Sequence, residues 1–133
     1  MPNQNRYISV VDDEADLAYL FKEALSTIGG VEVFAFTDPM LAIEHFEINH
    51  KNYRCVITDY RMPSMNGGQL LDRVKTVNPS VKGILMSAFE MHDDIFKGCQ
   101  SIDKFLSKPI KMSELIEIVQ QNMNQVEIKQ KTT

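Results

Sequence analysis

The chain has 133 residues, which is enough for one domain with a buried core and too short for two. Apolar residues make up 44% of it, which excludes a disordered chain, and no apolar run is long enough to cross a bilayer. The formal net charge is −4 and no basic run occurs, so we expect no direct contact with nucleic acid. The first residues lack the apolar core of a signal peptide, and Cys55 and Cys99 lie outside any metal-ligand spacing. We therefore expect a cytoplasmic protein that does not associate with membranes.

Short β-branched runs alternate with longer segments of helical period, a pattern typical of βαβ units around a parallel sheet. The sequence predicts five strands, at Tyr7–Val11, Val31–Phe36, Cys55–Thr58, Gly83–Met86 and Lys104–Leu106. It predicts helices over about Asp13–Ile28, from Pro39 to the polar stretch Asn49–Asn52, over Gln69–Val77, weakly over Asp93–Gln100, and from Ser113 to about Met123.

Local signals predict where three of these helices begin or end. The pair Gly29-Gly30 supplies a left-handed stop for the first helix. Thr37 or Asp38 caps the second helix, whose first turn holds Pro39, and Ser113 caps the last. The apolar residues expected in the core include Leu41, Ile43, Phe46 and Cys55.

Polar groups stand where the predicted strands end. Asp12 and Asp13 follow the first strand, Asp59 the third, Ser87 the fourth, and Lys108 comes shortly after the fifth. Because the carboxyl ends of parallel strands meet at one edge of a sheet, these groups should converge there, where open α/β sheets bind ligands. Three converging carboxylates repel one another unless a cation joins them, and one lysine does not neutralise three acids. The sequence therefore predicts a hard divalent metal ion, Mg²⁺, and an anion that meets the lysine.

Each of these residues also has a simpler interpretation. Asp12 and Asp13 could merely cap the following helix, but Asp59 precedes a loop and is too far from the next helix to cap it. Lys108 alone would be a solvated surface residue, although a cis peptide bond before Pro109 would aim it over the sheet edge. The hydroxyl of Ser87 could simply bond to backbone, or it could donate to a phosphoryl oxygen.

Four motifs occur together in the chain: Asp12-Asp13, the segment from Asp59 to Gly68, Ser87-Ala88, and Phe105 to Pro109. Their order and spacing resemble the receiver domain of two-component response regulators, over about Tyr7 to Met123. The resemblance implies a flavodoxin-like (βα)5 fold, with a doubly wound, five-stranded parallel sheet in the strand order 2-1-3-4-5. It also implies a receiver domain over residues 1–124 and a polar tail over 125–133.

The resemblance implies a role for each site residue. Asp59 matches the phosphoacceptor, Asp13 the direct metal ligand, Asp12 its neighbour that acts through water, and Arg61 the residue whose backbone carbonyl completes the Mg²⁺ site. Lys108 matches the lysine that pairs with the phosphoryl group. Two further matches are the switch residues, namely Ser87, the hydroxyl residue that moves toward the phosphate, and Phe105, the aromatic that turns inward behind it.

The partners implied are a sensor histidine kinase or histidine phosphotransfer protein, and a downstream effector protein. Such a domain is no classical enzyme, since it carries out self-catalysed phosphoryl transfer and autodephosphorylation at most. The chain resembles a stand-alone receiver, and two alternatives stay open: a non-phosphorylated interaction scaffold, or the receiver part of a longer regulator. A metal-dependent phosphatase would need a second acid where Arg61 stands. A flavin-binding protein would have its phosphate repelled by Asp12 and Asp13.

Overall fold

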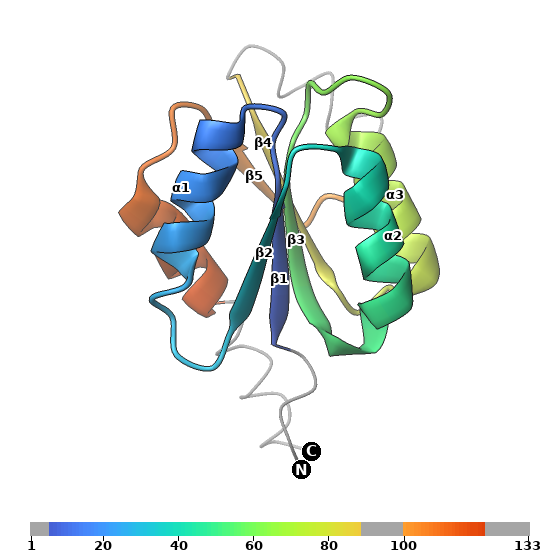
Figure 1. The fold of residues 1–133 in the computed structure, drawn as a ribbon, viewed down its shortest axis with the longest axis horizontal. Coiled ribbons are helices and arrows are strands. Elements are labelled where there is room, and N and C mark those ends of the chain that lie inside the picture. The colour runs from blue at the N-terminus through green and yellow to red at the C-terminus, as the bar shows by residue number, and fades with distance from the viewer. Residues whose placement is uncertain (1–5, 89–99, 122–133) are drawn as a thin grey trace.

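The computed structural model describes residues 6–88 and 100–121. Five parallel strands form one sheet in the order β2-β1-β3-β4-β5, which confirms the predicted fold class and strand order (Figure 1). The strands are β1 (Tyr7–Val11), β2 (Glu32–Phe36), β3 (Tyr53–Asp59), β4 (Lys82–Ser87) and β5 (Lys104–Ser107). The helices are α1 (Ala15–Leu25), α2 (Pro39–Asn49), the 3₁₀ turn η1 (His50–Asn52), α3 (Gly67–Val77) and a helical segment over residues 112–121. The predicted helix over Asp93–Gln100, apart from Gln100 itself, and the polar tail lie outside the described residues.

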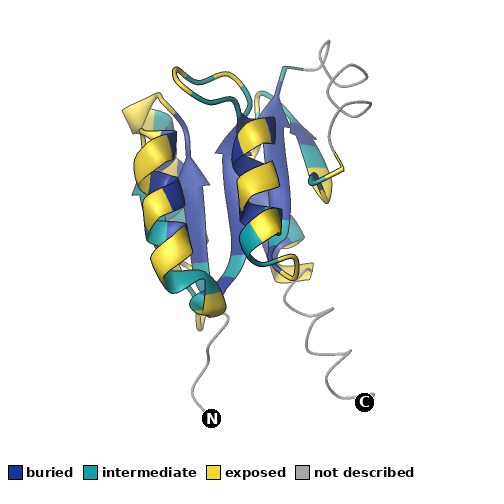
Figure 2. Cartoon of the chain, turned by 90° about the vertical axis from the view of Figure 1, so that its right-hand side faces the viewer, coloured by how far each residue is buried: buried dark blue, intermediate teal, exposed yellow. Residues whose placement is uncertain are grey.

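Helices cover both faces of the sheet, with α1 and the 112–121 segment on one side and α2 and α3 on the other (Figure 1). Each helix buries one side and exposes the other, as Figure 2 shows for α2 and α3. The first core cluster includes Ile8, Val10, Phe21, Leu25, Ile57, Met86, Leu115 and Val119. The second includes Val11, Ile43, Phe46, Val56, Leu70, Leu71, Val74 and Leu85. Because the sheet is covered twice, its central strands are apolar on both faces, as the run after Cys55 indicates.

The α1 helix is shorter than predicted at both ends. Its N-cap is Glu14, so Asp13 stays outside the helix. At the other end, Ser26 and Thr27 donate their hydroxyls to backbone carbonyls of the last turn, and the helix ends at Leu25. Gly30 has the predicted left-handed conformation, with φ of 82°. It lies beyond the turn that follows Leu25, so it reverses the chain after the helix has already ended.

The α2 helix begins as predicted, because the Asp38 side chain accepts a hydrogen bond from the Met40 N–H at 2.9 Å and Pro39 follows it. The expectation that Leu41 is buried was wrong, since its side chain is 55% exposed. Ala42 takes the sheet-facing position instead, because Leu41 lies about 100° away from it around the helix. The prediction that Ser113 caps the last helix was also wrong, since that helix begins at residue 112.

His45 of α2 lies half-buried against the edge of the sheet, and its Nδ1 is 2.7 Å from the hydroxyl of Tyr53. Its ring lies among four aromatic rings, those of Tyr7, Phe34, Phe36 and Tyr53. Burial lowers the pKa of His45, and the charge of Glu32 opposes this effect in part. The neutral imidazole is therefore the form that suits the fold.

Cys55 is a free, fully buried thiol, as expected. Burial raises the pKa of this thiol to about 12, so it stays protonated and acts as a small apolar residue.

Candidate functional site

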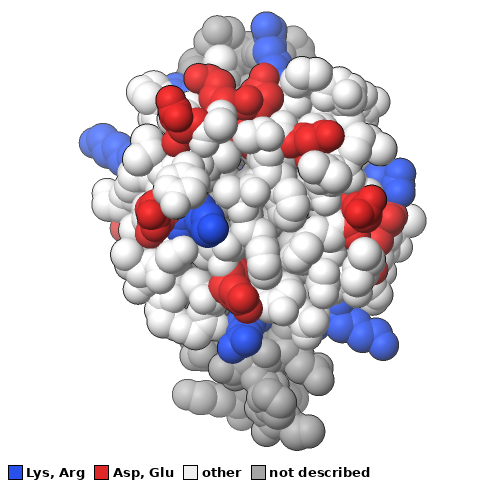
Figure 3. Space-filling model, in the orientation of Figure 1, with Lys and Arg blue, Asp and Glu red and all other residues white. Residues whose placement is uncertain are grey.

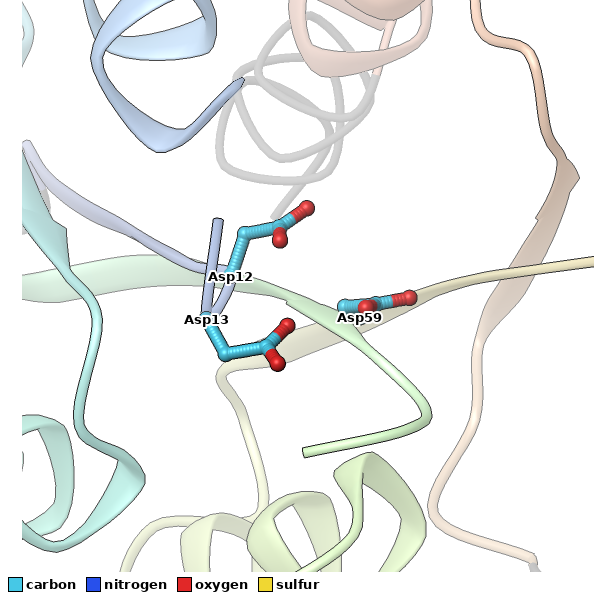
Figure 4. A group of neighbouring side chains, drawn as sticks. All are labelled: Asp12, Asp13 and Asp59. Atoms are coloured by element: carbon cyan, nitrogen blue, oxygen red, sulfur yellow. The ribbon is translucent and has the colours of Figure 1, made fainter. Parts of the chain in front are cut away.

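Three carboxylates meet at the end of the sheet where the strands finish. Asp12 and Asp13 follow β1, and Asp59 is the last residue of the neighbouring strand β3. The parallel register aligns Val11 with Thr58, so the residues that follow them emerge side by side. One oxygen of each carboxylate lies within 4.8 Å of the others (Figure 4). In the view of Figure 3, acidic side chains gather at this upper end of the molecule.

The two neighbouring acids after β1 have different surroundings. Asp12 is fully buried; its Oδ1 accepts a hydrogen bond from the Glu14 N–H at 2.9 Å, and its Oδ2 lies 3.4 Å from Lys108 Nζ. Asp13 is exposed. Both oxygens of Asp12 thus have protein partners, whereas Asp13 faces the solvent from which an ion would arrive.

Asp59 is 8% exposed, and main-chain and side-chain donors hold its carboxylate. Its Oδ1 accepts from the Tyr60 N–H at 3.0 Å and lies 3.1 Å from Lys108 Nζ. The Tyr60 N–H also points at the Met86 carbonyl of β4, 2.9 Å away. Burial raises the pKa of Asp59, and the hydrogen bond and charge of Lys108 oppose that rise.

Lys108 reaches the acids from the turn after β5. Its backbone N–H donates to the Ser87 carbonyl at 2.9 Å, and the Lys108–Pro109 peptide bond is cis. Burial alone would lower the pKa of Lys108, but its contacts with Asp59 and Asp12 outweigh burial and raise it. The lysine is therefore an ammonium, and three carboxylates with one ammonium leave the site two negative charges in excess.

The loop between β3 and α3 borders the acids. Arg61 in this loop is exposed. The end of the loop is fixed by the Gly67 N–H, which donates to the Tyr60 carbonyl at 2.8 Å, and by a reciprocal capping pair between Asn66 and Gln69. Beside Asp13 the loop forms an open cavity of about 400 Å³, lined by Asp13, Tyr60, Arg61, Met62, Pro63 and Asn66.

The two expected switch residues lie on the neighbouring strands. Ser87 is 3% exposed and ends β4, one residue after Met86, which is the register partner of Asp59. Phe105 is half-buried on β5, pairs in register with Leu85 and packs against the second core cluster. The structure thus brings Asp12, Asp13, Asp59 and Lys108 into one cluster, with Arg61 and Ser87 beside it and Phe105 further along the adjacent strand.

Five further residues around Asp59 were not predicted from the sequence. A Cβ atom at Gly67 would lie 2.3 Å from the Asp59 carbonyl oxygen, so only glycine allows α3 to approach this closely. The spacing of Asn66 and Gln69 is a capping signal that predicts a helix starting at Gly67, two residues before the predicted start. Thr58 and Met62 contact each other through the loop, and no periodic signal indicates such a contact.

The donor set fits a magnesium ion. Hard carboxylate oxygens in a group carrying two excess negative charges are the ligands that Mg²⁺ prefers, and the exposed side at Asp13 leaves room for water or a phosphate oxygen. Within residues 6–88 and 100–121, Asp12, Asp13 and Asp59 are the one cluster of at least three His, Cys, Asp or Glu side chains with this spacing. In the same ranges, no helix is long and apolar enough to cross a membrane.

Comparisons with known proteins agree with this geometry. A response regulator RppA from Synechocystis sp. is 28% identical over 110 residues, covering 82% of this chain and 47% of that protein. The response regulator protein FleR from Pseudomonas aeruginosa is 32% identical over 123 residues, covering 86% of this chain and 24% of that protein. The chain thus spans less than half the length of these curated relatives.

Solved structures support the same fold. A response regulator receiver domain protein from Clostridium thermocellum superposes with a TM-score of 0.83 at 24% identity, covering 92% of this chain and 98% of that one. The family model of the response regulator receiver domain matches residues 8–120, most of the chain. This family is a signalling family of two-component systems, and its members bind Mg²⁺ at an acidic pocket and interact with histidine kinases and effector domains. The chain belongs to the response regulator receiver domain family.

Proposed function

We propose that this chain is a phosphorylation-controlled receiver in which Asp59 accepts a phosphoryl group from the phosphohistidine of a sensor histidine kinase or a histidine phosphotransfer protein. One observation carries the proposal: the Asp59 carboxylate ends a central strand, 3.1 Å from Lys108 Nζ and within 4.8 Å of Asp12 and Asp13. A carboxylate nucleophile with a paired ammonium and adjacent metal ligands has what phosphoryl transfer requires, namely alignment and charge neutralisation.

Four residues would hold the metal ion. Asp13 and Asp59 offer carboxylate oxygens directly, Arg61 offers its backbone carbonyl, and Asp12, whose oxygens already have protein partners, acts through water. When bound, Mg²⁺ neutralises the negative charge that otherwise keeps an incoming phosphoryl group away from three carboxylates.

The transfer step is a displacement at phosphorus. One oxygen of Asp59 forms the new P–O bond while the P–N bond to the donor imidazole breaks, and the imidazole leaves with the bonding electron pair. The Tyr60 N–H holds the attacking carboxylate in one orientation, and Lys108 stays within reach of the transferred group. The protein thus contributes position and charge, and no covalent chemistry besides that of Asp59.

The phosphorylated state would differ from the free state around β4 and β5. In this proposal the Ser87 hydroxyl moves and donates a hydrogen bond to the phosphoryl group. The Phe105 side chain then turns into the space that Ser87 leaves, and this movement changes a protein-binding face. To shift an equilibrium from 1:99 to 99:1, the phosphoryl group must favour one state by about 5.5 kcal/mol. A charge-assisted bond to Lys108, a hydroxyl bond from Ser87 and the metal contact together are of that order.

The output of the switch is proposed to be a downstream effector protein, without direct contact to nucleic acid or membrane. We further propose that residues 1–124 form the receiver, that residues 125–133 form a polar tail, and that the protein acts in the cytoplasm. The relatives are longer than this chain, so the same switch would also serve as the receiver part of a multidomain regulator.

The deciding experiment measures intact mass after incubation with phosphoramidate, with and without Mg²⁺, beside an Asp59→Asn variant. The expected result is one added phosphoryl group that requires both Mg²⁺ and Asp59. Absence of the adduct, under conditions that label a reference receiver, would favour the non-phosphorylated scaffold and refute the proposal.

A further inference from the structure

The loop between β3 and α3 is fixed at its ends by main-chain hydrogen bonds. Tyr60 donates to the Met86 carbonyl at 2.9 Å, and Gly67 donates to the Tyr60 carbonyl at 2.8 Å. The residue that matters for the metal, Arg61, lies between these ties with its side chain exposed. A backbone carbonyl can complete a metal site only if its position is set, so the middle of the loop needs an anchor of its own.

Met62 provides a contact at this point. Its side chain is half-buried and packs against the second core cluster. Its sulfur lies 3.8 Å from Oγ1 of Thr58, a distance within reach of a hydroxyl that donates to the large, polarizable thioether. The residue directly after Arg61 is therefore attached to strand β3 underneath the loop.

Thr58 stands directly before Asp59 and is fully buried. Its Oγ1 also lies 2.9 Å from the backbone carbonyl oxygen of Asp59. The one hydroxyl thus contacts both the main chain of the proposed nucleophile and the loop that carries the Arg61 carbonyl.

Packing alone does not explain a threonine here. The preceding residues of β3, Val56 and Ile57, are apolar and buried, and a valine would fill the same space without a polar group that needs a partner. Space beside the Asp59 carbonyl is tight, because a Cβ atom at Gly67 would lie 2.3 Å from its oxygen. The hydroxyl has one proton, and its nearer acceptor is the Asp59 carbonyl oxygen at 2.9 Å, so the Met62 thioether at 3.8 Å makes a second, weaker contact with the same hydroxyl.

We propose that the contact between the buried Thr58 hydroxyl and the half-buried Met62 thioether sets the position of the Arg61 carbonyl relative to the Asp59 carboxylate. Both are positioning residues for the metal site, since neither touches the ion or the phosphoryl group. This inference rests on the proposed function, because it concerns the Mg²⁺ ligands assigned there.

The test is a titration of the full chain with MgCl₂ alone, followed by calorimetry, for Thr58→Val, Met62→Leu and two further variants. Thr58→Val should weaken Mg²⁺ binding about tenfold, as loss of an outer contact of a metal ligand does. Met62→Leu, which keeps the volume, should weaken it about threefold, the size of one weak hydrogen bond. Thr58→Ser, which keeps the hydroxyl, should restore most of the affinity.

Met65→Leu is the matched control, because Met65 lies in the same loop and packs half-buried against the same cluster. This variant should bind Mg²⁺ as the unmodified chain does. A second measurement separates positioning from folding: the rate of adduct formation with phosphoramidate should fall at low Mg²⁺ and recover at saturating Mg²⁺. A merely structural defect would lower the rate at every Mg²⁺ concentration.

Unchanged affinity in both Thr58→Val and Met62→Leu would overturn the inference while leaving the proposed function intact. An equal loss in Met65→Leu would also overturn it, since the effect would then belong to loop packing in general. If the unmodified chain binds no Mg²⁺, the proposed function itself fails and this inference fails with it. Should Thr58→Val not fold, Met62→Leu decides on its own.

Discussion

Replacing Gly67 by alanine tests whether the close approach of α3 to Asp59 is a real constraint. The added Cβ would lie 2.3 Å from the Asp59 carbonyl oxygen and 2.6 Å from a methyl carbon of Leu85. Ordinary contact begins at 3.4 Å, so the atoms must separate by about 1 Å. The carbonyl belongs to a buried central strand and the leucine is fully buried, so neither can yield freely.

The expected cost follows from these contacts. Overpacking of this kind costs about 3 kcal/mol, the upper part of the usual range, because a main-chain atom obstructs the methyl group. Alanine recovers about 1 kcal/mol through its better helix propensity. The net loss in the free energy of unfolding should be about 2 kcal/mol, which lowers the midpoint of thermal unfolding by roughly 8 °C.

Urea unfolding followed by circular dichroism measures this loss, with Gly29→Ala as the matched control. A Cβ at Gly29 meets nothing within 4 Å and its φ is not positive, so that variant should be as stable as the unmodified chain or slightly more so. Equal stability of the Gly67→Ala and Gly29→Ala variants would refute the reasoning. It would mean that the end of β3 and the start of α3 separate without cost.

Three further predictions concern other parts of the molecule. Mg²⁺ at ten times its dissociation constant should stabilise the fold by about 1.4 kcal/mol in thermal unfolding, and Asp13→Asn should remove most of that gain. The pKa of His45 is lowered in the fold, so the unfolded chain binds more protons below pH 6.5 and stability should fall as the pH drops through that range. His45→Gln should flatten this slope in urea unfolding at pH 7 and pH 5, and an unchanged slope would contradict the assignment. The buried Gly83 N–H donates to the Asp103 carboxylate at 2.7 Å, and Asp103→Ala removes this acceptor, so the free energy of unfolding should fall by about 2 kcal/mol. Lys75→Ala removes only an ion-pair partner of the same carboxylate and should lower the free energy of unfolding by less than about 1 kcal/mol.

The sheet and the convergence of the site could be predicted because both follow from periodic or local signals. Apolar runs between turn residues give the strands, and an acid directly after a run gives its place at the sheet edge. Asp59 Oδ1 and Lys108 Nζ lie 3.1 Å apart because Asp59 ends β3 and Lys108 directly follows β5, although the two residues are 49 positions apart in the printed sequence. Topology alone brings such residues together.

The predictions from the sequence were wrong where two local effects compete to decide the position of a residue. They were silent where a contact is made across a loop. Leu41 was placed in the core with Ile43 and Phe46 because it is apolar, although it does not lie on the helical face that Ile43 and Phe46 share. The start of α3 was placed too late because Gly67 was interpreted as a loop residue, while the cap at Asn66 decides the boundary. The contact between Thr58 and Met62 depends on the path of the loop, which no pattern in the sequence specifies.

The Tyr60 N–H, shared between the Asp59 carboxylate and the Met86 carbonyl, has a practical consequence for how this protein can be observed. Every residue except proline supplies that N–H, so the orientation of Asp59 does not depend on the side chain at position 60. The chain has no tryptophan, so Tyr60→Trp would introduce a single indole fluorophore next to Asp59. Its emission would then report events at Asp59 in real time. Because the main-chain N–H orients the Asp59 carboxylate, the substitution would leave that orientation undisturbed.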